Sequence, residues 1–309
     1  MKTGRTLISA PLLTLISLGW AAGPGGNGAN AQTLNFDYPS GFTLDVKVTG
    51  QTVRQGIRVD DLSFISPAGR RVAAYFVRPP AAGRFPAILY LHWLGDPSTS
   101  NRNEFLPEAL ALARENVVSL LTDCLWLDEK AFPWTGRDAV YDRQQCVRAA
   151  VEARLAVDLL LRRTEVDPRR IAVVGHDFGA MTAAQLAGVD PRVRTFVLMA
   201  GTPHYHYWFF RFSKLDEALR PGYISEMSQI DPAALIAKAE GSNFLFQFSR
   251  GHDKWVSEAE AREFYQAAAG VKQILWYADV DHSMKSPGAD KDRLNWLRQR
   301  LSIPKRPGQ

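Results

Sequence analysis

The sequence predicts an α/β fold, in which a mostly parallel β-sheet is covered by helices on both faces. Short, continuous apolar runs recur along the chain, as is typical of strands buried on both faces of a sheet. They alternate with segments of helical periodicity; in residues 142–163, for example, Val147, Val151, Leu155 and Leu159 are four residues apart. With 309 residues, 46% of them hydrophobic and 22% charged, the chain can bury the core of one such domain.

Each element is predicted from its apolar pattern and from the residues that bound it. A Ser-Pro-Ala-Gly turn separates the first two extended runs and predicts a hairpin. Gly188 closes one helix, and Gly201-Thr202-Pro203 ends one strand. The predicted strands are 57–65, 71–78, 85–91, 117–121, 171–175, 194–200, 243–249 and 272–277, and the predicted helices are 103–116, 142–163, 180–187, 258–268 and 289–301. Residues 202–242, the lid segment, are rich in aromatic side chains and are expected to be irregular.

The first 31 residues predict a secretory signal peptide. Lys2 and Arg5 precede an apolar run at 7–18, and Ala29-Asn30-Ala31 fits a cleavage site. The run is shorter than the roughly 20 residues of a membrane-spanning helix, which argues against the alternative of an N-terminal anchor. We therefore expect a secreted or periplasmic protein, with an N-terminal arm at 32–56 containing one strand near 42–48, a single domain at 57–303 and a tail at 304–309.

Charge and cysteine content narrow the classes of partner. The formal net charge of +5 falls to +3 when Lys2 and Arg5 leave with the signal, and the remaining basic residues are scattered, which argues against nucleic-acid binding. No other stretch is apolar enough to cross a membrane, so no membrane association is expected after cleavage. Cys124 and Cys146 allow two interpretations, a disulfide formed after export or two buried free thiols.

Three predicted strands are followed by ionisable residues, at the sheet edge where ligands bind in parallel sheets. Asp177 follows the strand 171–175 within Gly-x-Asp-x-Gly, residues 175–179, which we call the elbow. Two glycines around one polar residue suit a sharp strand-to-helix turn. Asp253 follows the strand 243–249, and His282 follows the strand 272–277. The order is that of a nucleophile, an acid and a histidine.

This arrangement resembles the α/β-hydrolase superfamily, and most of all its dienelactone-hydrolase-related branch, over residues 57–301. The elbow, the Gly-x-Asp step at 251–253 and His282 carry the resemblance. It implies an α/β-hydrolase fold, a mostly parallel central sheet with helices on both faces, here with a short aromatic-rich lid insertion, and it implies hydrolase activity. The roles that the resemblance implies are nucleophile for Asp177, acid for Asp253, base for His282, and oxyanion-hole donors for the backbone N–H groups of Trp93 and Phe178.

An aspartate at the elbow, where the superfamily usually has serine, changes the expected chemistry. A carboxylate is ionised at neutral pH, and its attack on a saturated carbon that carries a leaving group, or on an epoxide, gives an alkyl ester. His282 would then activate water against the carbonyl carbon of Asp177. The elbow is similar to those of haloalkane dehalogenases and epoxide hydrolases, although those usually have Trp where this chain has Phe178, and His-Gly-x-Pro where it has His-Trp-Leu-Gly at 92–95.

Asp253 is expected to orient His282 by accepting a hydrogen bond from its second ring nitrogen. Asp281 competes for this role, but adjacent side chains seldom face each other. Aromatic residues of the lid segment either wall an apolar substrate pocket, with two tyrosines as donors to an epoxide oxygen, or only pack the lid onto the sheet. The candidate pocket residues are His92, His176, Tyr205, Tyr207 and Trp208.

The sequence therefore predicts a hydrolase of a small, largely apolar molecule that works through Asp177, Asp253 and His282. One alternative is an ester or lactone hydrolase of the dienelactone type, in which Asp177 is a base for water. A second is a binding protein that keeps the fold without catalysis. No metal or organic cofactor is expected, because the histidines show no ligand spacing and no glycine-rich phosphate loop is present.

Overall fold

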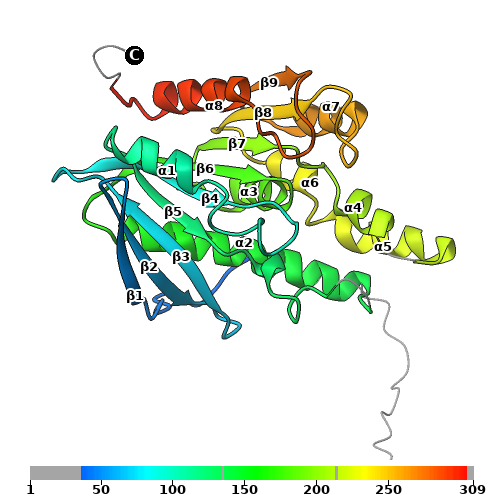
Figure 1. The fold of residues 1–309 in the computed structure, drawn as a ribbon. Helices are drawn as coiled ribbons and strands as arrows, with labels where there is room; N and C mark the ends of the chain where they lie inside the picture. Colours follow the sequence, from blue (N-terminus) through cyan, green and yellow to red (C-terminus); the bar gives the residue numbers. More distant parts are fainter. Residues whose placement is uncertain (1–35, 134–135, 213–214, 305–309) are drawn as a thin grey trace, which may run out of the picture. The chain divides into compact units, whose positions relative to one another are not determined.

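The computed structural model describes residues 36–133, 136–212 and 215–304, which form a nine-stranded sheet with helices on both faces (Figure 1). The predicted signal peptide, residues 1–31, lies outside the described residues, so export stays a prediction. Among the described residues, no helix has the length and apolar character needed to cross a bilayer.

The predicted alternation of strands and helices is confirmed. The elements are β1(Lys47–Arg54), β2(Ile57–Ile65), β3(Arg71–Arg78), β4(Phe85–Leu91), α1(Leu106–Ala113), β5(Val118–Thr122), η1(Leu125–Leu127), α2(Ala139–Leu161), β6(Val166–His176), α3(Phe178–Val189), β7(Thr195–Met199), α4(Tyr205–Phe212), η2(Glu217–Leu219), α5(Arg220–Ser228), α6(Pro232–Ile236), β8(Asn243–Ser249), α7(Glu258–Ala267), β9(Val271–Tyr277) and α8(Pro287–Arg300). Four strands, β2, β3, β4 and β8, have the predicted bounds, because continuous apolar runs between turn residues mark both ends of a strand.

The strand order is β1-β2-β3-β5-β4-β6-β7-β8-β9. Strands β1, β2 and β3 pair antiparallel, as do β3 and β5, whereas β5, β4, β6, β7, β8 and β9 pair parallel. The carboxyl ends of β4, β6, β8 and β9 therefore lie along one edge of the sheet. Strand β1 belongs to the segment interpreted as an N-terminal arm, and it extends the sheet by pairing with β2.

Two hydrophobic cores lie on opposite faces of the sheet. Alternate side chains of β4 enter different cores, because successive residues of a strand point to opposite faces. Leu89 packs in the core that includes α2 and α3, and Ile88 and Tyr90 pack in the core that includes α1 and α8. Figure 1 shows the same division, with α1 and α8 on one side of the strands and α2 and α3 on the other.

The lid segment is helical, so the expectation that it is irregular was wrong. It contains α4, the turn η2, α5 and α6. In α4, Tyr205, Trp208 and Phe209 are buried at three- and four-residue spacing on one face. The composition concealed this pattern because residues on the other face of α4 are aromatic too, so that hydrophobicity alone showed no period.

Candidate active site

The elbow is a tight turn between β6 and α3 that requires both of its glycines. Asp177 connects the two elements with φ 55° and ψ −115°, a strained conformation for a residue with a side chain. A Cβ atom on Gly175 would lie 2.3 Å from the carbonyl oxygen of Gly179, and one on Gly179 would lie 2.1 Å from that of Leu91. The strand, the turn and the loop after β4, residues 92–95, which we call the oxyanion loop, therefore pack too closely for any other residue at these two positions.

The Asp177 carboxylate is enclosed, with 0% of the residue exposed. Its Oδ2 accepts a hydrogen bond from the backbone N–H of Leu94 at 2.9 Å. Its Oδ1 has no hydrogen-bond partner among the described residues. Burial raises the pKa of Asp177 to about 6, against the opposing effects of the charges of His282 and His176 and of the N–H groups of Leu94 and Phe178.

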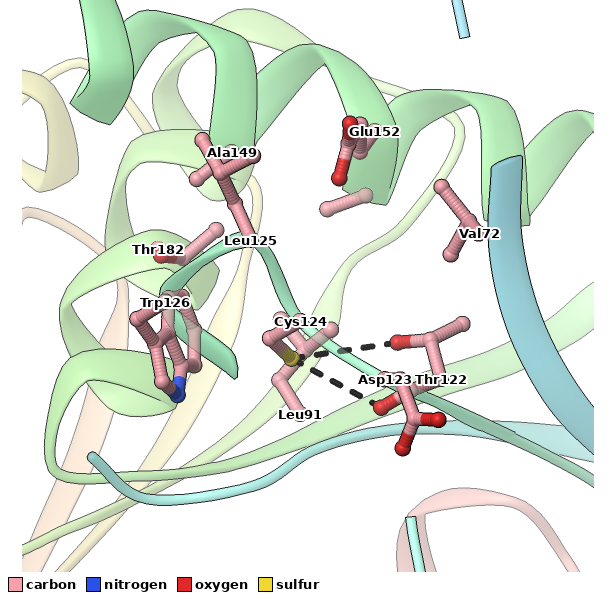
Figure 2. Close-up of a pocket in the computed structure, with 11 residues that line it drawn as sticks. Val72, Leu91, Thr122, Asp123, Cys124, Leu125, Trp126, Ala149, Glu152 and Thr182 are labelled. Carbon is pink, nitrogen blue, oxygen red and sulfur yellow. Dashed lines mark hydrogen bonds between the residues drawn. The ribbon is translucent and has the colours of Figure 1, made fainter. Parts of the chain in front are cut away.

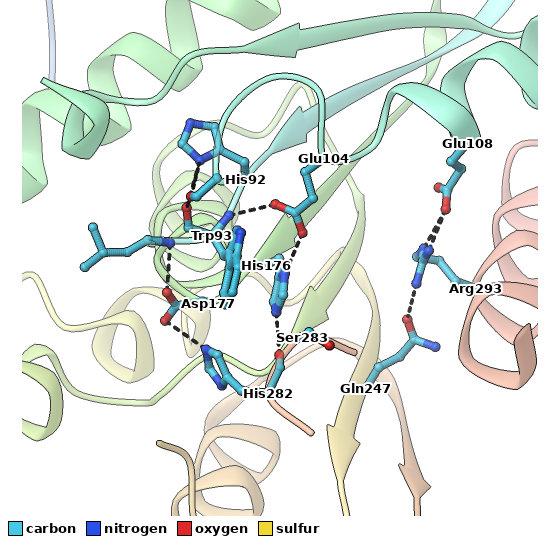
Figure 3. A network of polar contacts seen from close by, with 12 residues as sticks. His92, Trp93, Glu104, Glu108, His176, Asp177, Gln247, His282, Ser283 and Arg293 are labelled. Atoms are coloured by element: carbon cyan, nitrogen blue, oxygen red, sulfur yellow. Dashed lines mark hydrogen bonds and ion pairs between the residues drawn. The ribbon is translucent and has the colours of Figure 1, made fainter. Parts of the chain in front are cut away.

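The structure brings Asp177, Asp253 and His282 together at the sheet edge. Figure 3 shows two of them, Asp177 and His282, facing each other. His282 follows β9, and its Nδ1 lies 2.9 Å from Oδ2 of Asp253. Its Nε2 faces Oδ1 of Asp177 at 3.9 Å and has no hydrogen-bond partner among the described residues. Asp253 follows β8, where its Oδ1 also accepts the N–H groups of Trp255 and Val256 at 2.7 and 3.0 Å. The acid is thus fixed by backbone donors before it orients the histidine.

Asp281, the competing partner for His282, is engaged elsewhere. Its Oδ1 accepts the backbone N–H of Ser283 at 3.0 Å and the hydroxyl of Ser283 at 2.6 Å. Its side chain therefore closes a local turn, which leaves Asp253 as the carboxylate that contacts the imidazole.

The oxyanion loop differs from the prediction by one residue. The N–H of Trp93, the expected donor, instead donates to Oε2 of Glu104 at 3.0 Å. The next amide, that of Leu94, points at the Asp177 carboxylate. The N–H of Leu94 is therefore the donor that is hydrogen-bonded to Asp177, and the N–H of Phe178 lowers the pKa of the same carboxyl group. The prediction differs from the structure because Glu104, which lies just before α1, accepts the hydrogen bond from the backbone N–H of Trp93.

His176 is a buried residue that connects two loops by hydrogen bonds, and it is not a pocket residue. Its Nδ1 lies 2.6 Å from Oε1 of Glu104, and its Nε2 lies 2.8 Å from the carbonyl oxygen of His282. Carboxylate and carbonyl oxygens only accept hydrogen bonds, so both ring nitrogens donate and the ring is a cation. Burial lowers the pKa of His176, but the Glu104 carboxylate more than offsets this effect, so that the pKa is raised. Figure 3 shows His176 linking Glu104 to the His282 loop.

His92 is also turned away from the site, so its prediction as a pocket residue was wrong. Its Nε2 accepts the backbone N–H of Cys124 at 3.0 Å, and its Nδ1 lies 2.8 Å from the carbonyl oxygen of Trp93. This pairing requires a neutral ring with the proton on Nδ1. Burial lowers the pKa of His92, in agreement with the neutral form. The side chain ties the oxyanion loop to the segment after β5.

Both cysteines are free and buried, which agrees with the second of the two interpretations. The Cys124 thiol lies near the hydroxyl and carbonyl oxygens of Thr122, beside a cavity of about 10 Å³ (Figure 2). A space of this size holds one water molecule at most. Burial raises the pKa values of both thiols, so neither is a reactive thiolate at neutral pH.

Of the predicted lid aromatics, Trp208 is the one whose ring contacts His282, a member of the triad formed by Asp177, Asp253 and His282. Its ring centroid lies 5.7 Å from that of His282 and 5.7 Å from that of Phe178. Its indole Nε1 is buried and has no hydrogen-bond partner among the described residues. The ring centroid of Trp93 also lies near His282, 6.0 Å from the centroid of the imidazole. The indole N–H of Trp208 is therefore an available donor beside the histidine.

The two tyrosines of α4 do not offer their hydroxyl groups to the site. Tyr207 donates to Oε2 of Glu263 at 3.0 Å, so its prediction as a pocket residue was wrong. Tyr205 packs its ring against Phe178 at 6.0 Å, while its hydroxyl interacts with Cys146 and Thr182. Tyr205 thus supports the elbow from outside, and neither tyrosine is placed to donate to a substrate oxygen.

No family model matches the sequence, and no curated protein matches it significantly. Solved structures do resemble it. Acetyl xylan esterase 1 from Thermoanaerobacterium sp. aligns with a TM-score of 0.67 and 16% identity, over 86% of this chain and 90% of that one. An acetyl xylan esterase from Paenibacillus sp. R4 gives 0.71 and 18%, over 84% and 90%. A candidate dienelactone hydrolase from Klebsiella pneumoniae gives 0.56 and 13%, over 84% and 99%.

The chain has the α/β-hydrolase fold. Identities of 13–18% establish the fold alone. Within this α/β-hydrolase fold, sequence reasoning missed two site residues, Leu94 and Glu104. The acidic residue before a helix was a weak signal for Glu104, and the sequence held none for Leu94.

Proposed function

We propose that this protein hydrolyses a small, largely apolar substrate through an alkyl ester formed on Asp177. One observation carries the proposal: Oδ2 of Asp177 itself lies against the N–H of Leu94. In a serine esterase the oxyanion donors receive the carbonyl oxygen of the substrate. Here they face an oxygen of the side chain at the nucleophile position, so they are arranged to stabilise charge that develops on the Asp177 carboxyl group.

In the first step, Oδ1 of Asp177 attacks a saturated carbon of the substrate. A C–O bond forms, the bond to the leaving group breaks, and the leaving group departs with the electron pair. Oδ1 suits this role because it is the carboxylate oxygen without a hydrogen-bond partner among the described residues. Burial raises the pKa of the Asp177 carboxyl group, and this makes the ionised carboxylate a better nucleophile than an exposed one.

In the second step, Nε2 of His282 takes a proton from water, and the resulting hydroxide adds to Cγ of Asp177. Negative charge moves onto Oδ2, where the N–H groups of Leu94 and Phe178 stabilise it. Asp253 stabilises the imidazolium through Nδ1. Collapse breaks the ester bond, His282 returns its proton to the departing alkoxide, and the products are an alcohol and the free carboxyl group.

The donors around the site favour a halide-type leaving group over an epoxide. Opening of an epoxide produces an alkoxide that needs a proton, and tyrosine hydroxyls would supply it. The hydroxyls of Tyr205 and Tyr207 are engaged elsewhere. A halide leaves as a stable anion and needs only a hydrogen bond, which the indole N–H of Trp208 can give.

A second candidate function is ester hydrolysis, and the solved structures favour it. Two of the similar structures are acetyl xylan esterases. In this version Asp177 does not bond to the substrate. It acts as a base that activates water against a substrate carbonyl, and the oxyanion donors must then exchange Oδ2 of Asp177 for the substrate oxygen.

The test is to trap the intermediate in His282→Gln, which removes the base of the second step. The variant is incubated with a panel of haloalkanes, epoxides and esters, and the intact protein is weighed. A stable adduct of one alkyl group, mapped to Asp177 and missing in the matched double variant Asp177→Asn/His282→Gln, supports the alkyl-ester mechanism. Wild-type ester turnover without any adduct overturns it in favour of the second candidate, and wild type that turns over nothing on the panel overturns both.

A further inference from the structure

A cluster of two histidines and an aspartate lies where the lid segment leaves the sheet. His204 and His206 stand at the start of α4, and Asp231 precedes α6. One potential ligand atom from each residue lies within 4.8 Å of the other two. This cluster takes no part in the triad. The sequence did not predict it, because Asp231 is brought to the histidines by the fold of the lid.

His204 is held between two carboxylates. Its Nδ1 lies 2.8 Å from Oδ2 of Asp231, and its Nε2 lies 2.9 Å from Oε1 of Glu263 on α7. Both partners accept, so without a metal both ring nitrogens carry protons. Burial lowers the pKa of His204, but its hydrogen bonds and charge interactions with the two carboxylates raise it overall. The proton between Nδ1 and Asp231 occupies a position that a cation can take.

The surrounding contacts already have the pattern that supports a metal site. A histidine that binds metal through one nitrogen commonly donates its other N–H to a carboxylate. Nε2 of His204 has such a partner in Glu263, which is itself held by the hydroxyl of Tyr207 at 3.0 Å. Oδ1 of Asp231 accepts the backbone N–H of Tyr205 at 2.9 Å, which leaves Oδ2 as the oxygen that faces the histidine.

His206 supplies the third atom. Its ring lies 5.2 Å from that of His204, centroid to centroid. Its Nδ1 is buried and has no hydrogen-bond partner among the described residues. A buried polar atom without a partner is unfavourable, so this nitrogen is one that a ligand would satisfy.

We propose that Nδ1 of His204, Nδ1 of His206 and Oδ2 of Asp231 bind a divalent transition-metal ion of the zinc class. Two imidazole nitrogens and one carboxylate oxygen form a donor set that suits zinc, whereas calcium and magnesium prefer oxygen ligands throughout. Ligand atoms of a tetrahedral zinc lie roughly 3.3 Å apart. One candidate ligand atom of each residue lies within 4.8 Å of the other two, so the cluster needs to close only slightly. The side chain of His204 is 25% exposed, which gives the ion a path from solvent.

The ion would connect the first helix of the lid to the residue that precedes α6. Tyr205 lies between the two histidines and packs against Phe178 of the elbow. Trp208, one turn further along α4, contacts His282. A metal at this cluster therefore fixes the helix that covers the triad, and the inference is independent of the reaction proposed above.

The experiment measures zinc binding to the whole, untagged protein after chelator treatment and dialysis. We expect one zinc ion to bind per chain, as measured by isothermal titration calorimetry. Bound Co²⁺ is expected to give the visible absorption of a tetrahedral site. His206→Ala should weaken zinc binding by at least tenfold. Glu263→Gln, which replaces the charged acceptor at Nε2 of His204 by a neutral amide oxygen, should weaken it by about tenfold.

The matched control is His252→Ala, which removes an exposed histidine outside the cluster and should leave zinc affinity unchanged. Wild type that binds no stoichiometric zinc at micromolar concentrations overturns the proposal. So does zinc affinity in His206→Ala equal to that of the wild type, or a Co²⁺ spectrum of octahedral type. The Co²⁺ measurement uses wild type alone, so the proposal can fail even where a variant folds poorly.

Discussion

Nε2 of His282 and Oδ1 of Asp177 face each other at 3.9 Å, and neither has a hydrogen-bond partner among the described residues. Each buried polar atom left in this way costs about 1–3 kcal/mol of stability. The other polar atom of each side chain has a hydrogen-bond partner: Nδ1 of His282 is paired with Asp253, and Oδ2 of Asp177 accepts the N–H of Leu94. The protein thus orients two reactive atoms toward each other and leaves both available to a third molecule.

Asp177→Asn should stabilise the protein above pH 6. Burial raises the pKa of Asp177 from 3.8 to about 6, so between these values the folded state binds more protons than the unfolded state. Its contribution to stability therefore falls as pH rises through this window, by roughly 3 kcal/mol in total. Urea unfolding should show a stability gain for Asn that is small at pH 4 and reaches about 2–3 kcal/mol at pH 8. A gain that is the same at both pH values would contradict this assignment.

Glu104→Gln should move the pH dependence of turnover. His176 is a cation because Glu104 faces it, and that cation lowers the pKa of Asp177. Without the carboxylate His176 becomes neutral, so Asp177 ionises at higher pH and the acidic limb of the rate profile should shift upward by on the order of one unit. The control is Glu115→Gln. It also removes a carboxylate, one that pairs with Arg298 and not with a histidine. An equal loss of rate at every pH would show a structural role only.

Gly179→Ala should prevent stable folding or cost more than about 3 kcal/mol. The added Cβ would lie 2.1 Å from the carbonyl oxygen of Leu91, which is backbone and cannot rotate away. A Cβ added to Gly222, in α5, would meet no neighbouring atom within 4 Å beyond the backbone of its own helix. Gly222→Ala should therefore stabilise the helix by up to about 1 kcal/mol. Thermal unfolding of the two variants beside the wild type provides the comparison, and equal effects would refute the packing argument.

Asp177→Ser should exchange one activity for another. The serine side chain lacks the second oxygen that faces Leu94, so the N–H groups of Leu94 and Phe178 become available to the carbonyl oxygen of an ester. His282 would then act as base for the hydroxyl. Hydrolysis of a small activated ester should exceed that of Asp177→Ala by about a hundredfold, with loss of any alkyl-halide activity. Equal rates for Ser and Ala would mean that the donors do not form a working oxyanion hole.

The features that were predicted best from the sequence are those that depend on neighbouring residues along the chain. The strand bounds and the placement of Asp177, Asp253 and His282 at strand ends follow from apolar runs and turn residues, which are local. Whether the N–H of Trp93 or that of Leu94 points at Asp177 depends on a shift of one residue in the loop. Glu104, from a different part of the chain, decides this because it accepts the N–H of Trp93. Local pattern carries no information of that kind.

The roles of the histidines show the same limit. His92 and His176 lie beside the oxyanion loop and the elbow in sequence, yet their rings bind backbone and carboxylate partners far along the chain. The direction of a side chain depends on packing that the pattern of residues does not encode. In the lid segment, aromatic residues on both faces of α4 concealed its helical period for a related reason.

The complete enclosure of Asp177 has a kinetic consequence. With none of this residue exposed and Trp208 packed on His282, substrate cannot meet the carboxylate until neighbouring side chains give way. The rate of that opening sets an upper limit on turnover, whatever the speed of the bond-breaking steps. Turnover limited in this way slows as solvent viscosity rises and varies little with the leaving group, so that the fastest substrates are the slimmest molecules and not the most reactive ones.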